Sequence, residues 1–160
     1  MNKLFPLALM SHILAGAVAF AEVPNTQVAE PQTISLRVEQ LNGTWEGSYT
    51  CSQGLTTLTL VIEAESTTNI DAVFLFSEHP RNLGVPSGRF RMIGNLEVFD
   101  SPDIPDLLTL EGTTWLNRPS GYSTVNLTGD VSSSERRITG NVTGANNCTT
   151  FDVVKREGIL

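Results

Sequence analysis

The sequence has few of the side chains on which metal binding and nucleophilic catalysis depend. Its 160 residues include two Cys and two His, and only one of these histidines, His79, lies beyond the N-terminal 21 residues. Zinc sites use three or four His, Cys or carboxylate ligands at close spacing, which this chain does not offer. A Ser-His-Asp hydrolase would need His79 as its base, but no G-x-S-x-G motif accompanies it. We therefore expect no catalytic residue and no cofactor, and a His79-dependent hydrolase is the least favoured alternative.

Basic residues are also scarce. Ten Lys and Arg stand against 17 Asp and Glu, which gives a formal net charge of −7. Nucleic-acid binding depends on clusters of Lys and Arg that neutralise phosphates, so we expect no nucleic-acid partner. An anionic membrane surface is disfavoured for the same reason.

Long apolar runs are absent except at the N-terminus. The run from Leu4 to Phe20 follows Lys3 and ends in the small-x-small site Ala19-Phe20-Ala21, a combination typical of a signal peptide. It is short for a bilayer span and interrupted by polar residues. We predict a signal peptide over residues 1–21 that is cleaved near Ala21, no membrane anchor, and a periplasmic or secreted protein.

The next stretch, residues 22–40, contains two prolines and little periodicity, and we expect a flexible leader. The apolar residues of its last part, Ile34–Leu41, have a spacing that fits either a short strand or one helical turn. No stretch of the sequence has a clear amphipathic helical pattern.

The two cysteines, Cys51 and Cys148, are an even count in a chain predicted to be exported, which indicates one disulfide. A bridge that closes so long a loop stabilises the fold by up to roughly 4 to 5 kcal/mol in chain-entropy models. The alternation of the flanking residues puts the two cysteines on different faces of their strands. Either a bulge intervenes, or the bridge lies at a rim beyond the regular pairing.

Beyond residue 40, short stretches with alternating apolar and polar residues predict seven to nine strands and no intervening helices. The clearest begins at Trp45 and places Gly47, Tyr49 and Cys51 on the same face as the tryptophan. The others are 56–64, 70–77, 89–99, 107–110, 123–131, 137–144 and 148–155, whereas 112–122 reads as an ordered loop. This pattern predicts a single all-β domain over residues 41–156, most simply an antiparallel eight-stranded up-and-down barrel, with a β-sandwich as the alternative. The barrel is favoured because the predicted disulfide joins the first and last strands, which are neighbours in a closed barrel.

Two resemblances support this fold. Gly43-Thr44-Trp45 resembles the G-x-W opening of the first strand in lipocalins and avidins, which are eight-stranded barrels with a ligand cavity. In lipocalins a late arginine covers this tryptophan, and the resemblance offers Arg136, Arg137 or Arg156 for that position. Nothing after Trp45 matches the biotin-contacting residues of avidin.

A longer pattern resembles an uncharacterised domain of exported bacterial proteins. It comprises W-x-G-x-Y-x-C-x-Q-G-x-T from Trp45 to Thr56, V-P-S-G-x-F from Val85 to Phe90, W-x-x-R-P-x-G-Y from Trp115 to Tyr122, and C-x-x-F from Cys148 to Phe151. The resemblance covers most of the chain beyond residue 40. It implies a single domain with paired cysteines and implies no activity.

Candidate binding residues are arginines and aromatic residues in the middle of the chain. Arg89 and Arg91 share one face of their predicted strand, where they could recognise a carboxylate or phosphate, or pair with the abundant surface acids. Trp115, Arg118 and Tyr122 have the composition of interface hot spots, although a tryptophan above a barrel end can also close the core.

A calcium site is a weaker candidate. Asp100, Asp103 and Asp106 recur at three-residue spacing, and carboxylate oxygens on a loop suit Ca²⁺. The run lacks the alternate spacing and central glycine of an EF-hand loop.

Together these features predict an exported, non-catalytic binding domain that contacts a protein partner, as an inhibitor or interaction module, through the loops 79–87 and 115–122. The alternative is a carrier of a small apolar or anionic ligand inside the barrel. The two differ in the barrel interior, because a carrier needs a cavity of roughly several hundred Å³. The shortage of aromatic residues and the many medium-sized apolar ones favour a filled core.

Overall fold

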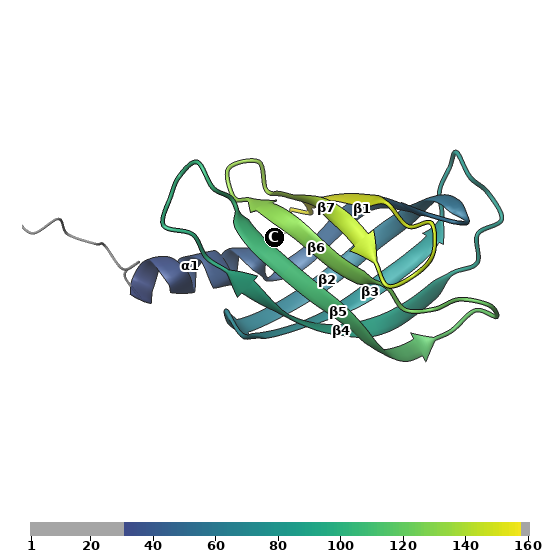
Figure 1. Ribbon diagram of the computed structural model, residues 1–160, viewed down its shortest axis with the longest axis horizontal. Helices are drawn as coiled ribbons and strands as arrows, with labels where there is room; N and C mark the ends of the chain where they lie inside the picture. The colour runs from purple at the N-terminus through teal and green to yellow at the C-terminus, as the bar shows by residue number, and fades with distance from the viewer. Residues whose placement is uncertain (1–30, 158–160) are drawn as a thin grey trace, which may run out of the picture.

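The computed structural model describes residues 31–157, which form one helix and eight strands (Figure 1). The predicted signal peptide and the first part of the predicted leader lie outside the described residues. The elements are α1 (Pro31–Leu41), β1 (Gly43–Cys51), β2 (Gly54–Ser66), β3 (Asn69–Glu78), β4 (Gly88–Glu97), β5 (Asp106–Asn117), β6 (Asn126–Ser132), β7 (Arg137–Thr143) and β8 (Thr150–Lys155).

The strands form a closed barrel in which each strand pairs antiparallel with the next and β8 pairs with β1. The predicted up-and-down barrel is therefore confirmed, and the sandwich alternative is wrong. The alternation in the sequence sets which face points inward. In β2, for example, Leu58, Leu60 and Ile62 are buried in the barrel, whereas Thr59 and Val61 between them are partly exposed on the outside.

Side chains fill the interior of the barrel. Leu58, Phe74 and Phe90 are almost fully buried at its centre, and the rings of Phe74 and Phe90 stack with their centroids 4.7 Å apart. The core continues through all eight strands to Phe151 and Val153 of β8. The middle of the barrel is thus packed core, as expected for small eight-stranded barrels.

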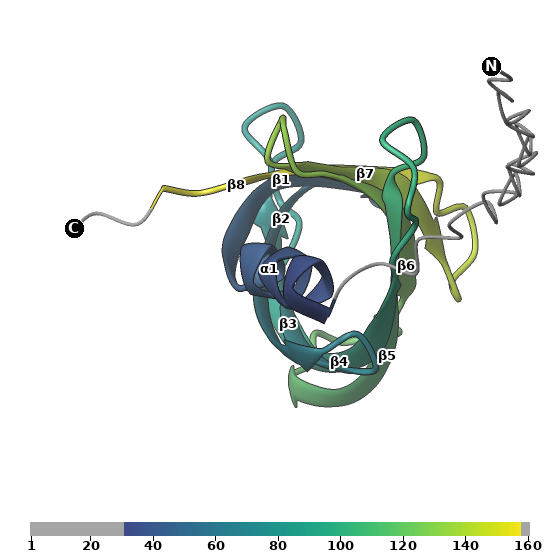
Figure 2. The same cartoon turned by 90° about the vertical axis from the view of Figure 1, so that its left-hand side faces the viewer.

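Helix α1 closes one end of the barrel (Figure 2) and corrects the prediction of a flexible leader through residue 40. Val38 and Leu41 are buried and Ile34 packs beside them, whereas Leu36 is 59% exposed. The buried positions follow the i, i+4, i+7 spacing of one helix face, which leaves Leu36 outside. Pro31 suits the first helical position because its φ is already helical. Helix α1 is neither long nor apolar enough to cross a membrane, and it is the single helix of residues 31–157.

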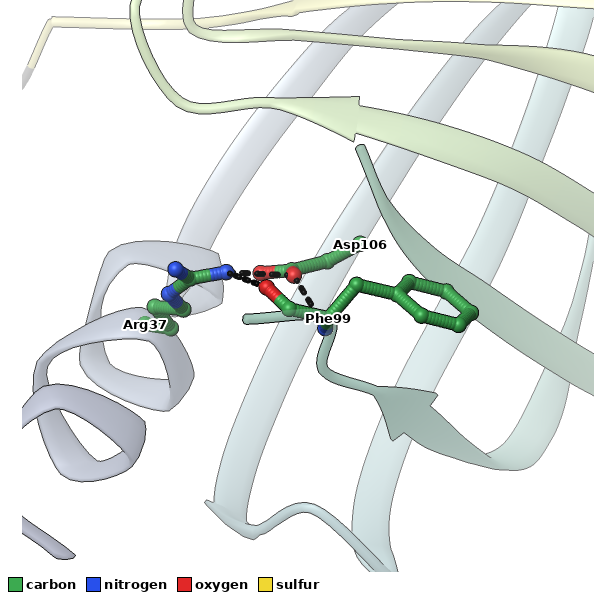
Figure 3. A network of polar contacts seen from close by, with 3 residues as sticks. All are labelled: Arg37, Phe99 and Asp106. Carbon is green, nitrogen blue, oxygen red and sulfur yellow. Dashed lines mark hydrogen bonds and ion pairs between the residues drawn. The ribbon is translucent and has the colours of Figure 1, made fainter. Parts of the chain in front are cut away.

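A polar contact attaches α1 to the loop between β4 and β5 (Figure 3). Arg37 Nη1 donates to Asp106 Oδ1 at 2.6 Å and to the Phe99 carbonyl at 3.1 Å. The Phe99 N–H in turn donates to the same carboxylate oxygen at 3.1 Å. One carboxylate therefore fixes both the helix and the end of the loop.

Trp45 of β1 lies under the helix, where its Nε1–H donates to the Leu41 carbonyl at 2.8 Å. The cation over its ring is Lys155 of β8, with Nζ 5.6 Å from the ring centroid. The lipocalin resemblance pointed to an arginine at this place, and the structure puts a lysine there. Lys155 also donates to the Gln40 carbonyl, so the last strand contacts the helix directly.

The predicted disulfide between Cys51 and Cys148 is present at the opposite end of the barrel. Cys51 is the last residue of β1, and Cys148 lies just before β8. The Thr149 N–H donates to the Thr50 carbonyl at 2.9 Å, beyond the regular pairing of the two strands. Of the two explanations for the different faces of the cysteines, the rim position is therefore correct.

Strand β5 is longer than the sequence suggested. Residues 112–122 were expected to form a loop, but β5 runs to Asn117. Its last part stays paired with β4, with register shifts on either side of Phe90 where β5 contains extra residues. Such bulges hide the regular alternation and bend the strand.

Candidate binding surface

The predicted binding residues come together at the end of the barrel opposite α1. Arg89 and Arg91 lie at the start of β4, Trp115 lies near the end of β5, and Arg118 and Tyr122 lie in the loop 118–125 that follows it. In the β4–β5 register Arg89 is opposite Asn117, and Phe90 is opposite Trp115. We call these five residues the arginine–aromatic surface.

The two aromatic residues of this surface are anchored in the core. The Trp115 ring packs edge-on against buried Phe90, with centroids 5.0 Å apart. Tyr122 stacks on Phe76 at 5.3 Å. Both rings are half-buried, so each packs against the core and still contributes to the surface. The two alternatives for Trp115, core closure and surface contact, therefore apply together.

Gly88 allows the loop after β5 to approach β4 closely. A Cβ at this position would lie 2.4 Å from the Phe76 ring and 2.8 Å from Pro119. The Asn117 side chain also donates to the Ser87 carbonyl at 3.4 Å. The missing side chain of Gly88 thus lets the loop that carries Arg118 pack against the barrel.

Arg118 is held in place by its own loop. Its Nε–H donates to the Tyr122 carbonyl at 2.9 Å, and its guanidinium carbon lies 5.9 Å from the centroid of the Trp115 ring. An arginine over an aromatic face gains a cation–π attraction and loses less freedom when it binds a ligand.

Arg89 and Arg91 point outward from β4, beside partly exposed apolar residues of β3. Leu75 is opposite Arg89 and Val73 is opposite Arg91. Strand β3 is thus apolar on both faces, and its outward residues are covered because the aliphatic part of an arginine packs on apolar surface while its charged end stays in water.

Ion pairing divides the eight arginines of residues 31–157 into two groups. Arg37, Arg136, Arg137 and Arg156 each pair with a carboxylate. The other four form no ion pair within the described part of the chain; they are Arg81, Arg89, Arg91 and Arg118. The expectation that surface acids would neutralise Arg89 and Arg91 is therefore not met. In a protein with net charge −7, these four arginines lie on β4 and in the loops at the end of the barrel opposite α1.

A pocket of about 390 Å³ lies at the mouth of the barrel, beside the disulfide. Tyr49, Gln53, Tyr122 and Asn146 contribute its polar groups. Gln53 Nε2 donates to the Tyr49 hydroxyl at 2.9 Å, and burial raises the pKa of Tyr49, so this group stays protonated. The sequence pattern placed Tyr49 on the same face as Trp45 but did not indicate the pocket, because its walls come from three separate loops.

The remaining sequence candidates do not form a site. His79 Nδ1 accepts the Arg81 N–H at 3.1 Å and shapes a turn. Asp106 is buried against Arg37, whereas Asp100 and Asp103 are exposed. Among residues 31–157, no three His, Cys, Asp or Glu side chains are arranged to hold a metal ion. The three aspartates that suggested calcium therefore do not converge.

Comparison of the chain with protein-family models, with curated proteins and with solved structures finds no match.

Proposed function

We propose that this protein is an exported, non-catalytic binding domain that recognises a partner protein through the arginine–aromatic surface. The observation that carries the proposal is that Arg89, Arg91 and Arg118, which form no ion pair among the described residues, lie at the same end of the barrel as two half-buried aromatic rings. Arg, Trp and Tyr are the residues most enriched in interface hot spots. Guanidinium groups without an internal partner are available for bidentate contacts with carboxylates.

Three other features of the molecule support protein binding at this surface. The barrel and its disulfide hold both rings and Arg118 in fixed positions before binding, which lowers the entropy cost of association. The acidic remainder of the protein repels an acidic partner and so favours its approach to the arginines. The disulfide agrees with an oxidising compartment, and the predicted signal peptide supplies the route there.

The test is capture of partners from the exported proteins of the source cell with three forms of the protein. The first is wild type. The second carries Arg89→Glu, Arg91→Glu and Arg118→Glu. The third, a matched control, carries Arg136→Glu and Arg156→Glu, which are exposed arginines with ion-pair partners elsewhere on the barrel. A protein retained by wild type and by the control but lost from the triple variant is expected. Equal retention by all three forms, or no retained protein, would contradict the proposal.

A second candidate function is binding of a small polar ligand in the mouth pocket. The observation that favours it is the hydroxyl and amide lining of Tyr49, Gln53 and Asn146. The packed centre of the barrel leaves the mouth as the place for such a ligand. Native mass spectrometry of protein purified from its source tests this candidate: a bound small molecule that is lost in Tyr49→Phe supports it, and a protein of unmodified mass contradicts it.

A further inference from the structure

The last part of β5 has an edge that no strand of residues 31–157 covers. β5 pairs with β4 as far as Asn117, opposite Arg89. Its pairing with β6 ends much earlier, where Leu110 is opposite Leu127. Gly112 is still occupied on that side, because its N–H donates to Asn126 Oδ1 at 3.0 Å. The segment Thr113–Asn117 therefore runs past β6, and Figure 1 shows the end of β5 extending beyond β6.

Nothing in the following loop replaces the missing strand. The loop 118–125 makes an internal hydrogen bond from the Tyr122 N–H to the Pro119 carbonyl, and no backbone hydrogen bond joins it to Thr113–Asn117 among the described residues. Thr113, Thr114 and Asn117 are exposed, and Leu116 is 43% exposed. Alternate residues of an antiparallel strand direct their N–H and C=O groups to opposite sides. Part of this segment thus presents unpaired backbone groups to solvent.

Such an edge is a template for a further strand. Residues 113–117, Thr-Thr-Trp-Leu-Asn, contain no lysine, proline or glycine to block pairing, and threonine and tryptophan favour extended structure. The bulges opposite Phe90 bend this part of β5 away from regular pairing. The segment stays attached to β4 on one side, and among the described residues its other edge is free for a strand of a few residues.

Charge selects what can bind there. Arg89 lies across from Asn117 on the neighbouring strand β4, and Arg118 follows Asn117 in the chain, so two arginines without an ion pair among the described residues lie near one end of the segment. Thr113 Oγ1 donates to the carbonyl of Arg91, which places the third arginine near the other end. A second copy of this chain would bring the same positive charges together. An acidic segment would neutralise them.

We propose that Thr113–Asn117 binds an extended, acidic segment of a partner protein as an added β-strand. Backbone hydrogen bonds supply the pairing, and carboxylates of the added strand contact Arg89, Arg91 and Arg118. This inference rests on the proposed protein-binding function and specifies how the partner docks. It follows the strand-addition mode by which several peptide-recognition domains bind extended peptides.

The first experiment uses synthetic peptides and the disulfide-bonded protein. The probe is a fluorescent seven-residue peptide that alternates Glu and Val; the control has Lys in place of Glu. Two further versions carry backbone N-methyl groups on either all the Glu or all the Val residues. In an added strand only one of these sets faces β5. We expect the acidic peptide to bind, the Lys peptide not to bind, and one methylated version to lose about tenfold in affinity or more while the other binds.

The second experiment changes the edge itself. Leu116 lies between paired positions of β5 and has no Cα partner on β4. Leu116→Pro removes its backbone N–H, whereas Leu116→Ala keeps it and serves as the matched control. Thermal unfolding establishes that each variant is folded. We expect Leu116→Pro to bind the acidic peptide about tenfold more weakly than Leu116→Ala. If Leu116→Pro does not fold, the methylated peptides decide the question alone.

Three outcomes overturn the inference. The first is equal affinity for both methylated peptides, and the second is an equal loss of affinity for both. The third is self-association of the wild-type protein through this edge, seen in sedimentation. The proposed function is tested separately. If partner capture depends on the arginines but not on the Leu116 N–H, only the docking mode is wrong. If capture does not depend on the arginines, the docking mode and the proposed function are both wrong.

Discussion

Arg37 and Asp106 are 69 residues apart in the sequence, yet Arg37 Nη1 lies 2.6 Å from Asp106 Oδ1. The two side chains differ in exposure, 28% for the arginine and 4% for the aspartate. A carboxylate so deeply buried depends on its cation and on the Phe99 N–H for compensation. This contact explains why a short helix stays attached to the barrel end.

Replacing Arg37 with Ala is therefore expected to lower the free energy of unfolding by about 2 to 4 kcal/mol, because the buried Asp106 carboxylate loses its charged partner. Urea denaturation measures the change. The double variant Arg37→Ala, Asp106→Asn should recover part of the loss, since the remaining group is neutral. Asp103→Asn, in the exposed part of the same loop, is the control. A loss equal to that of the control would contradict the account of this contact.

Removing the apolar contact that Leu41 of α1 makes with the barrel should also lower the free energy of unfolding. Leu41 is 1% exposed and Leu36 is 59% exposed on the same helix. Leu41→Ala is expected to destabilise the protein by about 2 to 4 kcal/mol through loss of buried apolar surface and the cavity left behind. Leu36→Ala should stay within about 0.5 kcal/mol of wild type. Similar values for the two variants would mean that α1 does not close the barrel in solution.

The disulfide gives a third prediction. Cys51 and Cys148 are separated by 97 residues, so their bond restricts the unfolded chain strongly. We expect the double variant Cys51→Ser, Cys148→Ser to lose up to about 4 to 5 kcal/mol of unfolding free energy. Guanidinium denaturation measures it. Addition of a reductant should destabilise wild type and leave the double variant unchanged; a reductant that affects both equally would exclude the disulfide as the cause.

An ion pair between the last two strands gives a prediction on pH. Arg137 Nε of β7 donates to Asp152 Oδ1 of β8 at 2.8 Å, and its Nη2 donates to the second oxygen. The hydrogen bond from Arg137 lowers the pKa of Asp152. The stabilisation is therefore fully present above the pKa of the unfolded chain, about 3.9, and is lost as the pH falls through the lower folded pKa.

Because this pair is exposed, solvent and salt screen it and the effect should be small. The measurement is the difference in unfolding free energy between wild type and Asp152→Asn, from neutral pH down to about pH 2. The difference should shrink only in the acid range. Asp130→Asn, at an exposed position of β6 that forms no ion pair among the described residues, is the control. A difference that stays constant with pH would contradict a charge-based contact.

The barrel could be predicted because its signal is local. Leu58, Leu60 and Ile62 alternate with Thr59 and Val61, and a period of two assigns each side chain to one face without knowledge of its neighbours. The pairing of Cys51 with Cys148 followed from their number and the predicted export. Closure of the sheet then followed from which two strands the cysteines join.

Features that depend on distant contacts could not be predicted. The spacing of Ile34, Val38 and Leu41 is compatible with a helix, but what stabilises the helix is Asp106, far away in the sequence. The continuation of β5 to Trp115 was hidden by bulges, which break the alternation. The sequence indicated Arg89, Arg91 and Arg118 as candidates, whereas their lack of ion-pair partners among residues 31–157 depends on where the carboxylates lie after folding.

The pairing of β1 with β8 has a consequence for how the protein is made. Trp45 is opposite Lys155 in this register, so the barrel closes only when the first and last strands meet. Contacts of such long sequence separation slow folding, because the chain must lose much of its freedom before they form. During synthesis the growing chain exposes an unclosed sheet until β8 has emerged. Holding the chain unfolded until synthesis is complete, as export in an unfolded state does, would avoid aggregation of this intermediate.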